Sequence, residues 1–140
     1  TSPDPDVTAM ALQALAPYYK GSTDVSEQVR GQVTEAVNRG ICVLSEIQNE
    51  DGTYSSWGTK NAESTAQVLV ALSSLGLDGD TDVRFIKNGH SVLDGLEQFY
   101  LTGKGAFELP MVAIRWRQNR HFMRWYPMTD IRIIKILYTI

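Results

Sequence analysis

The chain has 140 residues, of which 43% are apolar and 21% are charged, and its net charge is −3. This composition is ordinary for one globular domain, and the acidic balance argues against a nucleic-acid partner, which would require a basic face. A single cysteine, Cys42, excludes an internal disulfide, and no apolar run approaches the roughly 18 residues that suggest insertion into a membrane.

Two helices are predicted in the first third of the chain. Pro5 and Asp6 suit the first turn of a helix, where a missing N–H costs nothing and an acid meets the positive end of the dipole. A second helix opens near Asp24 at a capping-box pattern and runs to about residue 47. The glycines inside it, Gly31 and Gly40, lower its stability and are expected to mark close approach of another helix.

Two more helices are predicted before residue 110. Residues 48–60 show no helical period and form a loop. Asn61 caps a third helix that runs through Leu75, and a fourth helix begins near Ser91 after a polar turn. Because no convincing strand precedes residue 110, the predicted fold class is all-α.

A repeated helix start is the clearest internal pattern of the chain. The segments DVTAMALQAL and ESTAQVLVAL, aligned on Thr8 and Thr65, share Thr-Ala, then leucine (Leu12, Leu69), then Ala-Leu. The two threonines lie 57 residues apart. A helical repeat of this length is typical of arrays whose units cannot bury their apolar faces alone.

The turn before the second copy has a distinctive composition. Asp51-Gly52 predicts a tight turn with positive φ, and the Gln48 amide is able to bond free backbone groups at a helix end. Tyr54 and Trp57 supply rigid apolar area to cover the turn. Gln48, Asp51 and Gly52 are therefore predicted to be structural turn residues, and none of the group is an activated nucleophile or base.

This motif, followed by a helix that begins N-A-E-S-T-A, resembles the prenyltransferase/squalene-cyclase repeat superfamily of α/α toroids. It is most similar to terpene-cyclase-like domains in large surface proteins of Gram-positive gut bacteria. The resemblance covers residues 4–109 and is most specific in 48–75, with a further match at residues 84–89. It implies helical hairpins of a partial α/α toroid in residues 1–110. The helix start at residues 8–11 also resembles the toroid of vitamin B12 carriers.

The resemblance brings several catalytic motifs to test against the residues. The acidic run Asp78–Asp82 does not have the D-x-D-D spacing of a squalene-type cyclase and reads as a solvated turn. A zinc site would need Cys42 and His90, but Cys42 is predicted to be a buried small hydrophobe within a helix. The thioester motif of complement-type toroids is absent. No catalytic residue, metal site or cofactor is predicted.

Composition changes abruptly at Pro110-Met111. Residues 1–110 hold 15 acids and 7 Lys/Arg, whereas residues 111–140 hold one acid and 6 Lys/Arg, and two of the three tryptophans. Nucleic-acid or membrane binding would use such a mixture, but neither explains why the helical repeat stops where its next copy is due. We treat residues 111–140 as an aberrant tail.

The tail is compatible with a shifted reading frame. In the shifted frame, each codon consists of the third base of one original codon and the first two bases of the next. Under this rule, Met111-Val112 requires glycine, Trp125-Tyr126 requires valine and Met128-Thr129 requires aspartate. The permitted codons allow GGDQMATEQAFYALVSYDRYQNNKDSLYD, which repeats the Thr-x-x-Ala-x-x-Ala-Leu spacing of the first helix. The hypothesis is a frameshifted translation that replaces a closing helix and lowers stability. The underlying DNA tests it.

These patterns predict a non-catalytic repeat module of a bacterial surface or secreted protein that presents a concave face to an unknown ligand or partner. The opening TSPDPD lacks the features of a signal peptide and suggests a larger parent protein with other domains. Two alternatives stay open: an isoprenoid-processing enzyme and a cobalamin-type carrier of a small molecule. The candidate ligand-binding residues are Tyr54, Trp57 and Glu63, where a loop meets a helix N-terminus. The competing interpretation is that they only brace the turn.

Overall fold

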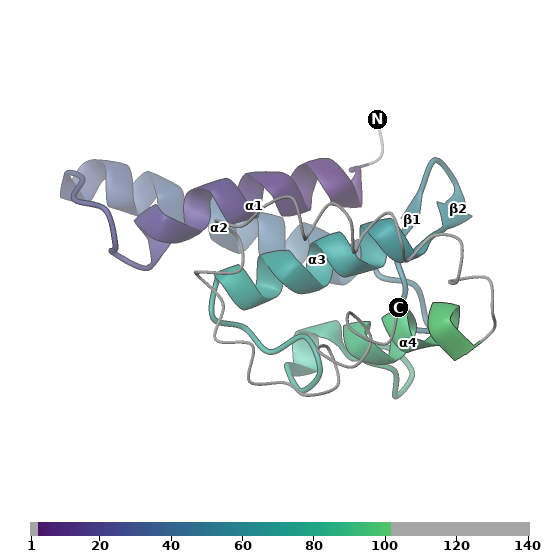
Figure 1. Cartoon of the computed structure of the whole chain (residues 1–140). Coiled ribbons are helices and arrows are strands. Elements are labelled where there is room, and N and C mark those ends of the chain that lie inside the picture. The colour runs from purple at the N-terminus through teal and green to yellow at the C-terminus, as the bar shows by residue number, and fades with distance from the viewer. Residues whose placement is uncertain (1–2, 102–140) are drawn as a thin grey trace.

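The computed structural model of the protein describes residues 3–101, and most of them are helical, which confirms the all-α class. Figure 1 shows how the elements follow one another along the chain. The elements are α1 (Pro5–Tyr19), α2 (Glu27–Ile47), β1 (Ser55–Ser56), β2 (Thr59–Lys60), α3 (Ala62–Ser74), the 3₁₀ turn η1 (Val83–Phe85) and α4 (Val92–Leu101).

The four helices pack around one core, in the contact order α2, α1, α3, α4. Helix α1 packs against both α2 and α3, and α3 also packs against α4. Figure 1 shows α1 and α3 side by side and running in the same direction, with the β1–β2 hairpin at the end where α3 begins. The largest fully buried side chains come from all four helices and the two loops between α2 and α4, and they include Tyr54, Phe85, Leu12, Leu44, Leu72 and Leu93.

Side-chain caps set the helix starts. Asp4, Ser26 and Asn61 each accept a hydrogen bond from the backbone N–H three residues later, which satisfies one of the free donors of a helix start. The cap of α2 corrects the sequence-based boundary. The helix begins after Ser26, not near Asp24, because the Ser26 hydroxyl accepts from the N–H of Val29.

The repeated helix start is also a repeated local structure. Asp4 and Asn61, 57 residues apart, are the N-caps of α1 and α3. Thr8 donates from Oγ1 to the carbonyl of Asp4 at 2.8 Å, and Thr65 donates to the carbonyl of Asn61 at 2.9 Å. The two helices are therefore equivalent in sequence register, cap and side-chain hydrogen bonding.

Two of the helical glycines lie in close contact with a neighbouring segment, Gly40 with a side chain and Gly95 with a backbone, and Gly31 does not. A Cβ at Gly40 would lie 2.7 Å from Leu12 of α1, as expected for a helix contact, whereas one at Gly31 would meet nothing within 4 Å. The expectation of close approach at Gly31 is therefore wrong. Gly95 of α4 is the tightest position, since its Cβ would lie 2.4 Å from the carbonyl carbon of Gly52.

The loop at 48–60 contains a short hairpin that the sequence did not predict. β1 and β2 pair antiparallel, with Ser56 opposite Thr59. Trp57 and Gly58 form the two-residue connection with φ of 53° and 77°. Two successive positive φ values are typical of a type I′ turn, whose twist suits a tight hairpin. The strands were missed because this turn has tryptophan where asparagine or glycine is usual.

Within residues 3–101, no helix combines the length and the apolar character that crossing a membrane requires. The tail at 111–140, its frameshift hypothesis and the expected loss of a closing helix lie outside the described residues.

The two glycine environments give a matched test of packing. We expect Gly95→Ala to lower the free energy of unfolding by about 3 kcal/mol, because its new methyl group would overlap the backbone of the Gly52 turn. Gly31→Ala should raise it by about 1 kcal/mol, since alanine is the better helix former and its Cβ meets open space. Urea unfolding of both variants measures the pair. Equal effects at the two positions would contradict the close contact between Gly95 and Gly52.

Candidate functional site

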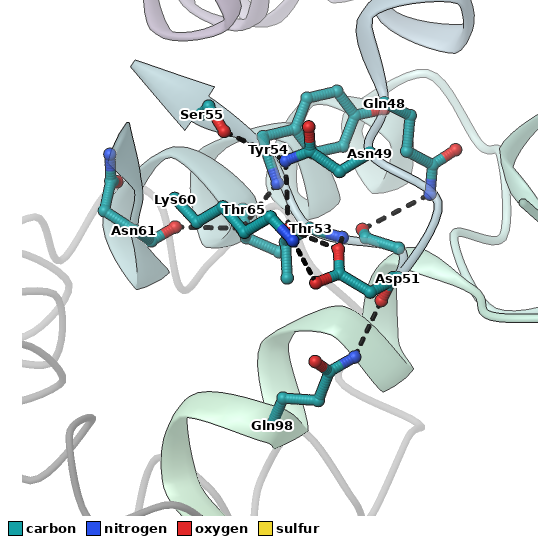
Figure 2. A network of polar contacts seen from close by, with 11 residues as sticks. Gln48, Asn49, Asp51, Thr53, Tyr54, Ser55, Lys60, Asn61, Thr65 and Gln98 are labelled. Carbon is teal, nitrogen blue, oxygen red and sulfur yellow. Dashed lines mark hydrogen bonds and ion pairs between the residues drawn. The ribbon is translucent and has the colours of Figure 1, made fainter. Parts of the chain in front are cut away.

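The candidate site is the loop from Gln48 to Asn61, which joins α2 to α3 and is drawn in Figure 2. Its first part is a closed turn. The Asn49 N–H donates to the carbonyl of Thr53 at 3.0 Å, and the Gly52 N–H donates back to the carbonyl of Asn49 at 3.0 Å. Gly52 has φ of 83°, as the Asp-Gly pattern predicts. This turn has no room for a side chain at position 52, where a Cβ would lie 2.1 Å from the carbonyl oxygen of Ser91.

The Asp51 carboxylate ties the turn to the hairpin. Oδ1 accepts from the hydroxyl of Thr53 at 2.6 Å and from its N–H at 3.2 Å, while Oδ2 pairs with Lys60 Nζ at 2.6 Å (Figure 2). Partial burial alone would raise the pKa of Asp51, but the bonds from Lys60 and Thr53 outweigh it and hold the pKa below its usual value. The carboxylate is therefore occupied by structural partners.

Gln48 bridges the loop to the segment before α4. Its Nε2 donates to the carbonyl of Gly52 at 3.3 Å and to the carbonyl of Phe85 at 2.9 Å, and the residue is only 7% exposed. The amide thus bonds free backbone groups as predicted, but they belong to the turn and to η1 and not to the end of α2. Phe85 could not be identified as a partner from local sequence, because the contact joins residues 37 apart.

Tyr54 anchors the loop in the core. The side chain is fully buried, and its hydroxyl donates to the carbonyl of Leu44 in the last turn of α2 at 2.8 Å. Its backbone N–H donates to Oγ1 of Thr65 at 3.0 Å. Burial raises the pKa of the phenol well above its ordinary value. Tyr54 thus joins the ends of α2 and α3.

Helix α4 supplies two contacts that the sequence did not single out. Gln98 donates from Nε2 to the carbonyl of Asp51 at 2.7 Å (Figure 2), and Gly95 lets the Gly52 turn lie directly on the helix backbone. A glycine inside a predicted helix is a signal of close backbone approach. Read in that way, Gly95 could have been found from the sequence.

The three candidate ligand-binding residues lie in different environments. Tyr54 is buried, Trp57 is 98% exposed at the hairpin tip, and Glu63 is exposed in the first turn of α3. The two aromatic side chains therefore do not share one surface. The expectation that Trp57 covers the turn is wrong, because the left-handed backbone at position 57 directs the indole into solvent.

The hairpin is also fixed from the side of α1. Ser56 donates from Oγ to Oδ2 of Asp4 at 2.9 Å, and Ser64 donates to Oδ2 of Asp6 at 3.1 Å. The pKa of the Asp4 carboxyl lies below its usual value, mainly because the carboxylate accepts a hydrogen bond from the N–H of Val7. Partial burial opposes this shift, and the bond from Ser56 adds to it. Both strands of the hairpin are thus held, β1 through Ser56 and β2 through the Lys60–Asp51 pair.

The residues weighed for catalysis lie in the following surroundings. Among residues 3–101 no group of three or more His, Cys, Asp or Glu side chains could hold a metal ion. In the acidic run, Asp82 pairs with Arg84 at 2.7 Å, and Asp78 accepts from the N–H of Asp80 at 2.9 Å. Cys42 is exposed, which contradicts the predicted burial, because it lies one position beyond buried Ile41 and so turns to the outer face of α2.

Comparison with protein-family models, curated proteins and solved structures finds no match to this chain. The likeness to α/α toroids therefore stays a prediction from the motif at 48–75. Within the chain, α1 and α3 have the same type of side-chain cap and threonine bond, at a spacing of 57 residues.

The buried phenol predicts an alkaline transition. The folded state keeps Tyr54 protonated, whereas the unfolded chain ionises it near pH 10. Its contribution to stability is complete below pH 10 and is lost as pH rises further, by about 1.4 kcal/mol per pH unit. Tyr54→Phe should be about 1 kcal/mol less stable at pH 7. The difference should disappear near pH 11 in urea titrations at each pH. A constant difference from pH 7 to 11 would contradict the burial of the hydroxyl.

The repeat provides a matched test of the Thr65 bond. Both Thr8 and Thr65 donate to the carbonyl four residues earlier, but Thr65 also accepts the buried N–H of Tyr54. We expect Thr65→Val to cost about 2 kcal/mol of unfolding free energy, because it leaves that N–H without a partner. Thr8→Val should cost less than about 1 kcal/mol. Thermal unfolding monitored by circular dichroism measures both, and equal losses would contradict the role of Thr65 in holding the loop.

Proposed function

We propose that the chain is a non-catalytic module of a bacterial surface or secreted protein, and that it binds its ligand or partner through Trp57. The observation that carries this proposal is the exposure of Trp57, which reaches 98% on a hairpin whose two strands are both anchored. A tryptophan on a rigid support presents a large contact area at little cost in conformational entropy. Tryptophan is also enriched among the residues that dominate binding energy at interfaces.

The backbone at position 57 strengthens the argument. Trp57 has φ of 53°, a left-handed conformation that a bulky side chain rarely adopts. Such a residue costs of order 1–3 kcal/mol and persists where the surroundings enforce it. An asparagine would serve a type I′ turn better. Neither the folding of the hairpin nor the core needs the indole, so a binding role accounts for its presence.

The proposal extends to the architecture. We infer that residues 3–101 are an arc of an α/α toroid, in which α1 and α3 are equivalent helices of successive repeats. The two helices contact each other and run in the same direction (Figure 1), which supports this interpretation, as does their shared N-terminal structure. The Gln48–Tyr54 turn then acts as the brace between α2 and the next repeat.

A single substitution separates a binding role from a structural one. Trp57→Asn should raise the free energy of unfolding by about 0.5–1 kcal/mol, because asparagine relieves the strain at positive φ and no packing is lost. Guanidinium unfolding of the wild type and the variant measures this change. A loss of 1 kcal/mol or more would mean that the indole braces the fold, and the proposal would fail.

Binding is tested by site-specific photocrosslinking. A benzophenone amino acid at exposed Thr59, which lies two residues after Trp57 and leaves the indole in place, should crosslink to intact Gram-positive gut bacteria or to immobilised mucin. The same amino acid at Val83, which is 82% exposed on η1, should not. Equal yields at the two positions would contradict the proposal. A change in the visible spectrum of added cobalamin, or turnover of added farnesyl diphosphate, would favour the carrier or the enzyme instead.

A further inference from the structure

One face of α1 is apolar and exposed along the whole helix. Val7 is 67% exposed, Met10 58% and Tyr18 38%, and Ala11 and Ala14 are also exposed. These five positions recur at the helical spacings of three, four and seven residues, so they form a continuous stripe. We call this stripe the free α1 face. A helix that is apolar on opposite sides is normally covered on both.

The repeat shows what covers the same face in the second copy. Each residue of the free α1 face has an equivalent in α3, 57 positions later in the chain. These equivalents are Ser64, Gln67, Val68, Ala71 and Leu75. Four of these are at most 5% exposed, and Gln67 is half-buried. Helix α1 lies against this part of α3, where Asp6 accepts from Ser64 and Gln13 Nε2 donates to the carbonyl of Gln67 at 3.5 Å.

We propose that the free α1 face is the docking surface for an α1-type helix of a further repeat unit, joined in tandem ahead of Asp4 in the parent protein. That helix would lie parallel to α1, in the register in which α1 packs on α3. The surface matches this partner in shape, because positions 11, 14 and 18 carry small or apolar residues, as positions 68, 71 and 75 do. Val7 and Met10 replace Ser64 and Gln67, so the contact at the helix start would be more apolar.

A second copy of this chain is a poorer occupant. In the assigned register, the incoming helix contributes the side that carries Asp6, Ala9, Gln13 and Ala16. In this chain that side is already engaged, since Ala9 and Ala16 are at most 4% exposed and Asp6 and Gln13 bond to α3. The middle of the matching side of α3 is covered as well, because Ala66 and Val70 are each 4% exposed, whereas Glu63 at the helix start is exposed. A tandem unit has no such conflict, because its α1-type helix would pack on α1 in the way that α1 packs on α3.

The connection between units also fits. Lys60 of β2 is followed by Asn61, the N-cap of α3, and Asp4 is the equivalent N-cap of α1. A unit ending in the hairpin could therefore continue directly into Asp4 as it now continues into Asn61. This inference does not depend on the proposed role of Trp57, since it rests only on the repeat and on the burial of α3.

The test is a duplicated chain, in which a second copy of residues 4–60 precedes Asp4 of the full 140-residue protein. The added copy carries Met10→Leu, so that the original Met10 alone reports on the free α1 face. Peroxide oxidation of Met10, followed by peptide mass spectrometry, should slow about tenfold or more relative to the natural chain. A tenfold change corresponds to about 1.4 kcal/mol of docking free energy. The midpoint of guanidinium unfolding should also rise.

Ala14→Glu in the original α1 is the matched control. In the natural chain it should leave both unfolding and Met10 oxidation unchanged, because Ala14 is exposed. In the duplicated chain it should restore fast oxidation, because its equivalent Ala71 is fully buried. Oxidation of Met10 as fast in the duplicated chain as in the natural one, whether or not the added copy is helical, would overturn the proposal. So would a dimer of the natural chain that Ala14→Glu abolishes in sedimentation.

Discussion

The contact between the Gly52 turn and the backbone of α4 at Gly95 is the constraint on which the loop depends. A Cβ at Gly95 would lie 2.4 Å from the carbonyl carbon of Gly52, and one at Gly52 would lie 2.1 Å from the carbonyl oxygen of Ser91, just before α4. The two main chains therefore touch without side chains between them. The approach brings the Asp51 carbonyl to Gln98 and the Gln48 amide to Phe85. Backbone polar groups that would otherwise be buried unpaired are thereby satisfied.

The same constraint explains why a polar loop can sit at the junction of the helices. Tyr54 enters the core between α2 and α3, and Thr65 receives its backbone N–H. The loop is therefore anchored in the core by Tyr54. It is also held at the hairpin by the bond from Ser56 to Asp4 and by the Lys60–Asp51 pair. With the base held so closely, only the tip is free to project, and the tip is where Trp57 lies.

Helices α1 and α3 show how one sequence pattern can meet two environments. Both begin with a side-chain cap and a threonine bonded to the carbonyl four residues back. Nine residues of α3 are buried and four residues of α1 are buried, although each helix contacts two other helices. Because the two helix starts share their caps and threonine bonds, the difference in burial comes from their tertiary surroundings and not from local propensity.

The sequence by itself determined the four helices, because their caps and apolar periods are local properties. It also determined the repeat and the positive φ at Gly52, since these too need only neighbouring residues. Tertiary structure decided what those residues touch. Gln48 reaches Phe85 across 37 residues, Gly95 meets Gly52, and Tyr54 turns inward while Trp57 turns outward. No local signal separates two aromatic residues three positions apart. The distinction follows from the left-handed turn at 57 and 58 and from the core space that α2 and α3 leave for only one of them.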